Sequence, residues 1–101
     1  NDTICELGCG FGKYLFLLRL NNISSRLEGY DISFNGIELA KKINSQFDAG
    51  ISFKQFDITK DLNKIDLSNK IIFTHLYCGS LTKVLLQKNL YRSLIGFYLF
   101  I

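Results

Sequence analysis

Short apolar runs alternate with longer segments of helical periodicity along this chain of 101 residues. The apolar runs predict β-strands at about Thr3–Leu7, Leu27–Ile32, Ile51–Ile58, Lys70–Thr74 and Ile95–Ile101. Between them, apolar residues recur at the spacing of one helix face and predict helices over about Phe11–Leu20, Gly36–Phe47 and Leu81–Tyr91. A chain that alternates strand and helix in this way builds a parallel sheet flanked by helices. The pattern therefore predicts an α/β fold with about five parallel strands.

Residues at the element boundaries agree with this order. Ser33 stands just before the second helix, where its hydroxyl oxygen can accept a backbone N–H, and Gly50 suits the end of that helix. The polar stretch 59–68 leaves room for a short helical turn. The fourth strand is continuously apolar along Ile71–Phe73, as buried parallel strands are.

Composition narrows the class of protein. Hydrophobic residues make up 48% of the chain and charged residues 21%, which is typical of a globular domain rather than a disordered segment. The net charge of +3 is small and the basic residues are scattered, so we expect no nucleic-acid partner. No apolar run approaches the roughly 20 residues of a membrane span, so we expect no membrane partner either.

Cysteine usage and the chain ends add two expectations. Three cysteines and one histidine lack the spacing of metal ligands, so the sequence predicts no zinc site. An odd number of cysteines without a signal peptide fits a cytoplasmic location. The chain starts directly at its first strand and stops inside an apolar run. We therefore expect residues 1–101 to be one partial domain, cut before a final β-hairpin.

The segment Glu6–Gly12 carries most of the functional information. Gly8, Gly10 and Gly12 alternate with other residues between the first strand and the first helix. Glycine lets the backbone bend sharply and approach a ligand without a Cβ in the way. In an open α/β sheet such a turn lies at the carboxyl end of a strand, where ligands bind. The segment predicts a site for a nucleotide-type cofactor, and the alternative is a turn with a purely structural role.

Three acidic residues fall at the carboxyl ends of the first three predicted strands. They are Glu6, Asp31 and Asp57, and the parallel sheet would bring them to a common edge. Asp31 could accept charge-assisted hydrogen bonds from both hydroxyls of a ribose, and Asp57 could accept one from the exocyclic amine of adenine. Glu6 could orient the glycine turn or attract an ammonium group. Two alternatives remain open: Asp31 could cap the next helix, and Asp57 could be a solvated strand end.

These segments resemble the motifs of the Rossmann-like (class I) S-adenosylmethionine-dependent methyltransferases. Glu6–Gly12 resembles their first motif, Gly29–Ser33 is similar to the second, and Phe56–Ile58 resembles the third. The segment Ile71–His75 matches the fourth strand of the family in character only. The resemblance implies cofactor contacts at Glu6, Gly8, Gly10, Gly12, Asp31, Ile32, Asp57, Ile58 and Thr74.

The spacing of the glycines separates this cofactor from NAD. The dinucleotide fingerprint G-x-G-x-x-G needs its third glycine where this chain has Lys13, and Gly12 comes one residue early. Carboxylates gathered at the same edge would repel a phosphorylated ligand more than a cationic sulfonium. The sequence therefore predicts S-adenosylmethionine, with an NAD-binding dehydrogenase half-domain or a non-catalytic nucleotide-binding fragment as the alternatives.

The segment after the fourth strand bears on the methyl acceptor. His75 is placed to act as a general base, but the favoured interpretation is a histidine that hydrogen-bonds loop backbone. Transfer from a sulfonium can proceed by alignment alone, so no base is required. Methylases of base amino groups typically carry an Asn-Pro-Pro-Tyr-like motif here, whereas this chain has Thr74–Tyr77 and no proline. No acidic residue follows Asp66 to bind a metal. We therefore expect a small-molecule acceptor and no metal.

Overall fold

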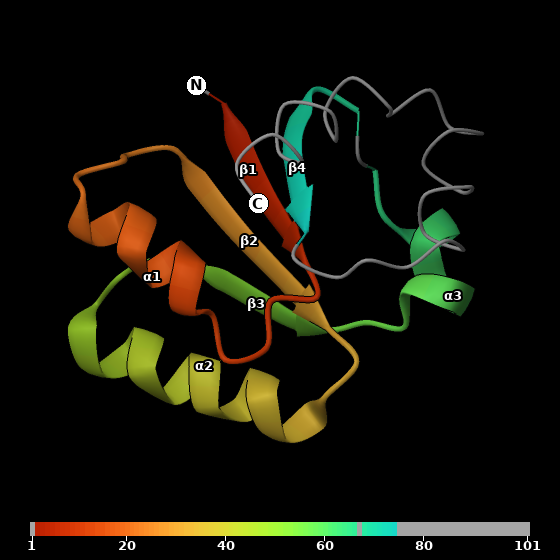
Figure 1. Cartoon of the computed structure of the whole chain (residues 1–101), viewed down its shortest axis with the longest axis horizontal. Helices are drawn as coiled ribbons and strands as arrows, with labels where there is room; N and C mark the ends of the chain where they lie inside the picture. Colours follow the sequence, from red (N-terminus) through yellow and green to blue (C-terminus); the bar gives the residue numbers. More distant parts are fainter. Residues whose placement is uncertain (1, 67, 75–101) are drawn as a thin grey trace.

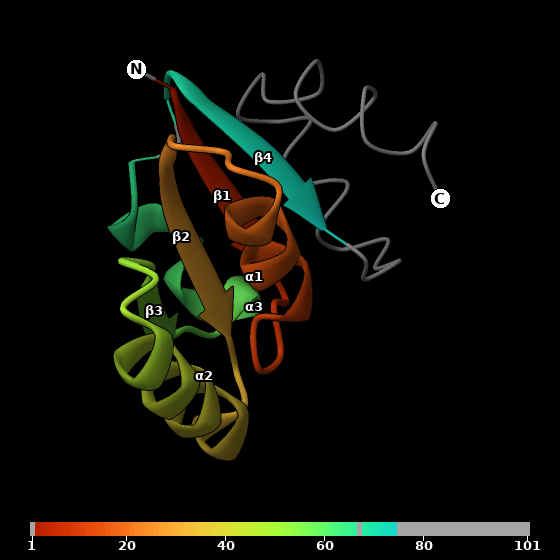
Figure 2. The ribbon, with the colours of Figure 1, turned by 90° about the vertical axis from the view of Figure 1, so that its left-hand side faces the viewer.

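The computed structural model describes residues 2–66 and 68–74. Along the chain, its elements are β1 (Thr3–Leu7), α1 (Lys13–Leu20), β2 (Arg26–Asp31), α2 (Phe34–Phe47), β3 (Ser52–Gln55), α3 (Ile58–Asp61), the 3₁₀ turn η1 (Leu62–Lys64) and β4 (Lys70–Thr74). The four strands form one sheet in the order β3-β2-β1-β4, and every pairing is parallel. Seen from the side, the strands fan from β3 at one edge to β4 at the other (Figure 2). The predicted α/β architecture is confirmed.

Helices α1 and α2 lie side by side over one face of the sheet (Figure 1). The register pairs Ile4 with Leu27 and Gly29 with Phe53, so these side-chain positions share the face beneath the helices. Leu15 of α1 and Ile37 of α2 are buried against this face. The buried members of the core are Cys9, Leu15, Leu27, Ile37, Ala40, Ile51, Phe53 and Phe73.

Gly29 of β2 lets α1 approach the sheet closely. A Cβ atom at this position would lie 2.8 Å from Leu15 Cδ1, 2.8 Å from Phe53 Cδ1 and 2.9 Å from Cys9 Sγ. These distances are shorter than van der Waals contact, so any side chain here would push the helix or the glycine turn away from the sheet. The absence of a side chain at Gly29 therefore sets the depth at which α1 packs.

The ends of α2 are held by side-chain hydrogen bonds. Ser33 Oγ accepts the Gly36 N–H at 3.0 Å, which confirms the predicted cap. At the other end Asp48 takes a left-handed conformation (φ 49°), so the helix ends before the predicted stop at Gly50. Asn44 then bonds both the N–H and the carbonyl oxygen of Ile51, each at 2.9 Å, and ties the helix to the residue before β3.

Most predicted boundaries agree with the structure, and the differences have local causes. β1 and β4 have the predicted bounds. α1 starts at Lys13 rather than Phe11, because Gly12 has a φ of 92° and cannot be helical. β3 ends at Gln55 rather than Ile58, because Ile58 already begins α3. The short helical turn expected within 59–68 is present as α3 and η1. The predicted helix Leu81–Tyr91 and the fifth strand lie outside the described residues.

None of the helices in the described part of the chain combines the length and the apolar character needed to cross a bilayer.

Replacing Gly29 by alanine tests the close packing of α1. We expect Gly29→Ala to lower the free energy of unfolding by about 1–3 kcal/mol, because the added methyl group overpacks a filled site. Urea denaturation measures the change. Ser52→Ala, at an exposed position of the neighbouring β3, is the control and should stay within about 0.5 kcal/mol of the parent chain. Equal stability of Gly29→Ala and the parent would contradict the packing argument.

Candidate cofactor site at the carboxyl edge of the sheet

The glycine turn between β1 and α1 uses backbone conformations that other residues rarely adopt. Gly8, Gly10 and Gly12 have φ angles of 78°, 57° and 92°. Each lies in the left-handed region, where a Cβ atom would clash with the backbone. The path of the chain therefore favours glycine at all three positions of the motif.

Two of these glycines differ in their surroundings. A Cβ at Gly12 would lie 2.7 Å from both Cε1 and Cζ of Phe53, so Gly12 packs the turn onto the sheet. A Cβ at Gly10 would meet no atom within 4 Å. The space beside Gly10 is open, and a ligand can approach the backbone there.

Hydrogen bonds from the turn hold it against the end of β2. The N–H groups of Gly8 and Cys9 donate to the carbonyl oxygen of Tyr30 at 2.7 and 3.0 Å. The Gly10 N–H donates to Asp31 Oδ1 at 3.1 Å, and Asp31 Oδ2 accepts the Ser33 N–H at 2.9 Å. A carboxylate has about four acceptor positions, so these two bonds leave half of its capacity for a ligand. Asp31 thus lies beside the glycine turn, as the sequence predicts, and it also orders the residues before α2.

Glu6 is buried at the centre of the sheet, next to this edge. It lies opposite Gly29 of β2 and Phe73 of β4, and only 1% of its surface is exposed. Burial is the main cause that raises the pKa of the Glu6 carboxyl to about 8, and the nearby Asp31 is the second cause. The neutral form of Glu6 therefore predominates at pH 7.

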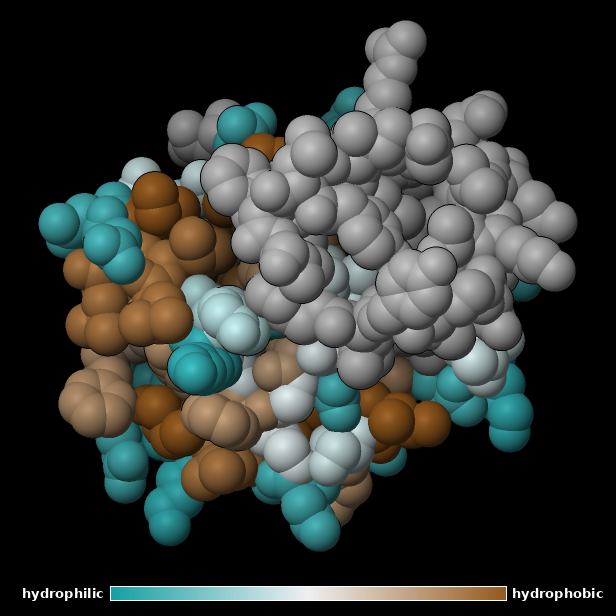
Figure 3. Space-filling view, in the orientation of Figure 1, coloured by the Kyte–Doolittle hydropathy of each residue, from teal (hydrophilic) through white to brown (hydrophobic). Residues whose placement is uncertain are grey.

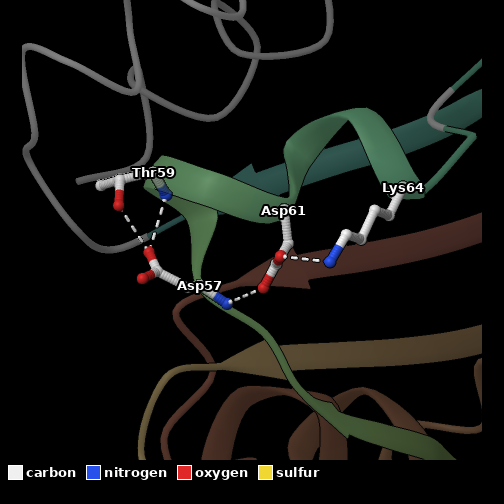
Figure 4. Close-up of polar contacts among 4 residues, drawn as sticks. All are labelled: Asp57, Thr59, Asp61 and Lys64. Carbon is white, nitrogen blue, oxygen red and sulfur yellow. Dashed lines mark hydrogen bonds and ion pairs between the residues drawn. The ribbon is translucent and has the colours of Figure 1, made fainter.

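Asp57 directly precedes α3, and its described contacts are with residues of that helical turn (Figure 4). Its Oδ1 accepts the Thr59 N–H at 2.9 Å and the Thr59 hydroxyl at 2.6 Å. The side-chain bond from Thr59 is the main reason that the pKa of Asp57 lies below its usual value. The Asp57 N–H donates to Asp61 Oδ2 at 3.1 Å, and Asp61 pairs with Lys64 at 3.0 Å. Asp57 therefore caps a helical turn, which gives it a structural role whether or not it also contacts a ligand.

Those of the other predicted site residues that the structure describes lie at the same edge. Ile32 follows β2 with 62% of its surface exposed, and its carbonyl oxygen accepts a bond from Gln55 Nε2 at 3.0 Å. Thr74 ends β4, is buried, and lies opposite Leu7 at the end of β1. Ile58 is the first residue of α3. His75 lies outside the described residues.

Sequence reasoning did not identify Gly36 as part of this site. A Cβ at Gly36 would lie 3.3 Å from both the carbonyl carbon and the carbonyl oxygen of Gly10. The first turn of α2 therefore packs directly on the glycine turn. A glycine inside a helix lowers helix stability by about 1 kcal/mol relative to alanine. The presence of such an unfavourable residue at position 36 was the sequence signal that could have indicated a close contact.

Among residues 2–66 and 68–74, no three potential ligands gather where they could hold a metal ion. Cys9, within the turn, is buried, and burial raises the pKa of its thiol to about 12. The thiol is therefore protonated at neutral pH. The described part of the site offers the open side of Gly10, the Asp31 carboxylate and the exposed apolar side chain of Ile32.

Comparison with known proteins shows the family of this chain. A family model described as "Methyltransferase domain" matches residues 1–94, which is almost the whole chain. The chain belongs to the methyltransferase domain family. The resemblance to Rossmann-like methyltransferases noted in the motifs is thereby confirmed. Among curated proteins, none matches the chain in sequence.

Solved structures of methyltransferases share the fold. The O-methyltransferase segment 942–1257 of StiE is 26% identical, with a TM-score of 0.69 over 92% of this chain and 33% of that one. A geranyl diphosphate C-methyltransferase from Streptomyces coelicolor, in complex with Mg²⁺, geranyl diphosphate and S-adenosyl-L-homocysteine, is 16% identical, with a TM-score of 0.66 over 80% of this chain and 33% of that one. The PH0226 protein from Pyrococcus horikoshii is 21% identical, with a TM-score of 0.64 over 87% of this chain and 42% of that one. This methyltransferase domain thus spans about a third to two fifths of the length of these relatives.

The buried Glu6 predicts a specific pH dependence of stability. Its pKa is about 8 in the folded chain and near 4.5 in the unfolded chain. Between these values the folded state retains a proton that the unfolded state releases. The contribution of Glu6 to the free energy of unfolding is therefore greatest below pH 4.5, and it falls as the pH rises from 4.5 through 8. We expect the loss to be on the order of a few kcal/mol.

Urea unfolding at a series of pH values measures this effect. Glu6→Gln keeps the shape of the neutral carboxyl group without a titratable proton, so the decline should largely disappear. Glu38→Gln, on the exposed surface of α2, is the matched control and should retain the decline. A parent chain whose stability is constant from pH 5 to pH 8 would show that Glu6 is not held neutral.

Proposed function

We propose that this chain is the cofactor-binding part of an S-adenosylmethionine-dependent methyltransferase. The observation that supports it most strongly is the hydrogen bond between the Gly10 N–H and the Asp31 carboxylate, beside an open face of the glycine turn. It brings the first two motifs of the resemblance into direct contact at the edge where α/β proteins bind ligands. Membership of the methyltransferase family supports the same cofactor.

The residues at this edge suit the separate parts of S-adenosylmethionine. The two acceptor positions left on Asp31 can receive the ribose hydroxyls. The exposed Ile32 side chain, which directly follows Asp31, offers an apolar surface to the adenine ring. The open side of Gly10 admits the amino-acid portion close to the backbone. In this proposal Gly8 and Gly12 maintain the bend, while Asp57, Ile58 and Thr74 border the site.

Charge at this edge fits a cation better than a phosphate. Asp31 is a carboxylate, and Glu6 becomes ionised more readily when a positive group is near. A diphosphate would lie against the Asp31 charge and would raise the cost of ionising Glu6 further. The spacing also departs from the dinucleotide motif, because Gly12 comes one residue early and Lys13 stands in place of the third glycine.

Bound here, S-adenosylmethionine would supply a methyl group already activated on a sulfonium sulfur. The chain's own contribution would then be to orient the donor and to exclude water, because alignment of two bound reactants can lower the barrier substantially. We propose a small-molecule acceptor approaching from the ends of β1 and β4, near Thr74. His75, the residue after β4, is our candidate for a base in substrates that lose a proton.

Removing the Asp31 carboxylate tests the cofactor assignment. We expect Asp31→Ala to weaken the binding of S-adenosyl-L-homocysteine, the demethylated product form, by about 1.5–3 kcal/mol, which is the contribution of hydrogen bonds to a charged group. Isothermal titration calorimetry measures the affinity. NADH, titrated into the parent chain under the same conditions, should give no heat of binding.

Asp31 also holds the start of α2, so a control must separate the two roles. Ser33→Ala removes only the hydroxyl that caps α2, and it should leave the cofactor affinity within about threefold because Asp31 remains. If Asp31→Ala and Ser33→Ala weaken binding equally, Asp31 acts through α2 rather than on the ribose. Tight binding of NADH would contradict the assignment of S-adenosylmethionine as the cofactor.

A further inference from the structure

A groove of about 490 Å³ runs between α1 and α2 on the outer side of the helix layer. Its walls are almost entirely apolar, and they include Phe16 and Leu17 from α1 together with Ile43 and Phe47 from α2. None of the proposed cofactor contacts lines this groove. Phe11, which lies between Gly10 and Gly12 in the glycine turn, does line it. A concave apolar surface of this size is typical of a site that receives a partner.

The side chains around this groove are exposed to an unusual degree. Leu20 and Phe47 have 77% and 76% of their surfaces exposed, and Phe11 and Leu17 are also exposed. Figure 3 shows hydrophobic side chains gathered over α1 and its boundary with α2. α1 also buries Leu15 on its inner side, so the helix is apolar on both faces. A helix with this pattern is normally covered on both faces, and contiguous exposed apolar residues mark interaction surfaces.

The two helices run in the same direction, so the ends of the groove are distinct. Near their starts, Gly36 packs on Gly10 of the glycine turn. Near their ends, the Arg19 guanidinium donates to the carbonyl oxygen of Ala49 at 2.7 Å. Lys13, at the start of α1, therefore marks one end of the groove, and Asp48, just after α2, marks the other.

These terminal charges are available to a partner. Lys13 lies over the ring of Tyr14, with 5.7 Å between the Lys13 nitrogen and the ring centre. Within the described ranges 2–66 and 68–74, neither Lys13 nor Asp48 forms an ion pair. Arg19, by contrast, is engaged by backbone carbonyls, including those of Ile23 and Ser25 at 2.7 and 2.9 Å. The groove thus carries an exposed positive charge at one end and an exposed negative charge at the other.

We propose that this groove is a self-association surface, on which two copies of the chain pack their α1–α2 faces about a two-fold axis. A two-fold axis that lies in the interface and crosses the groove exchanges its two ends, so Lys13 meets Asp48 of the partner subunit, and the same pair forms a second time by symmetry. The same rotation brings Leu20 and Phe47, at one end of the groove, toward the partner's Phe11 at the other end. Opposite charges at opposite ends make the surface complementary to itself, which favours a second copy over an unrelated protein.

The first experiment measures association of the 101-residue chain by sedimentation equilibrium. We expect a reversible dimer, and Phe47→Gln should raise its dissociation constant at least about tenfold, as loss of a buried aromatic anchor does. Phe34→Gln is the matched control: Phe34 is 58% exposed on the same helix but outside the groove, and this variant should stay within about twofold. Circular dichroism confirms that both variants keep their helix content.

Charge reversal tests the two-fold arrangement itself. Lys13→Glu and Asp48→Lys should each raise the dissociation constant about tenfold, because each places like charges together at both ends. An equimolar mixture of the two variants should form a heterodimer about as tight as the parent dimer, since both terminal pairs are then opposite in sign.

Three results would overturn the proposal. The parent chain could stay monomeric at its highest soluble concentration, which would assign the groove to another occupant, such as a different protein or a further part of a longer chain. A dimer that ignores Phe47→Gln would use a different surface. A mixture of Lys13→Glu and Asp48→Lys that associates no better than each alone would exclude the two-fold pairing.

Discussion

The hydrogen bond from the Gly10 N–H to the Asp31 carboxylate joins three parts of the fold at one point: the glycine turn, the end of β2 and the start of α2. It forms only because Gly10 adopts a left-handed conformation that directs its N–H toward β2. α2 can follow so closely because Gly36 has no side chain to meet Gly10. The carboxyl edge is therefore a set of mutually dependent contacts, and a ligand that binds Asp31 finds the turn already in place, which lowers the entropic cost of binding.

Electrostatics at this edge depends on the burial of Glu6 and, to a smaller degree, on its closeness to Asp31. Both ionised at once would place two negative charges in a region partly closed to water, and the raised pKa of Glu6 avoids that arrangement. Glu6 is the deeper of the two, and its burial favours the protonated form, while the Asp31 carboxyl accepts bonds from two N–H groups. The edge is anionic enough to favour a cation without the repulsion of a fully ionised pair.

The sequence predicted the strands better than the contacts between them. β1 and β4 were delimited correctly because continuous apolar runs define buried parallel strands, and Ser33 was found because capping is a local interaction. The packing of Gly36 on Gly10 escaped prediction, since it joins residues far apart in the sequence. Asp57 was placed at a strand end, yet its bonds to Thr59, two residues later, start a helix there. Periodicity assigned residues to helix faces, but it did not reveal whether the outer face of α1 was covered.

The glycine turn links the carboxyl edge to the groove between the helices. Phe11 lies between two left-handed glycines, and it is also part of the groove lining together with Lys13. Gly10 leaves its side of the turn open to a ligand, and Gly12 packs the turn on Phe53, so Phe11 lies between an accessible residue and a tightly packed one. Coupling between two binding events is reciprocal: if a ligand at the edge prefers one arrangement of the turn, a partner in the groove that prefers the same arrangement must bind more tightly in its presence. The turn from Gly8 to Gly12 therefore takes part in both surfaces, with Gly10 at the open side of the carboxyl edge and Phe11 in the lining of the groove.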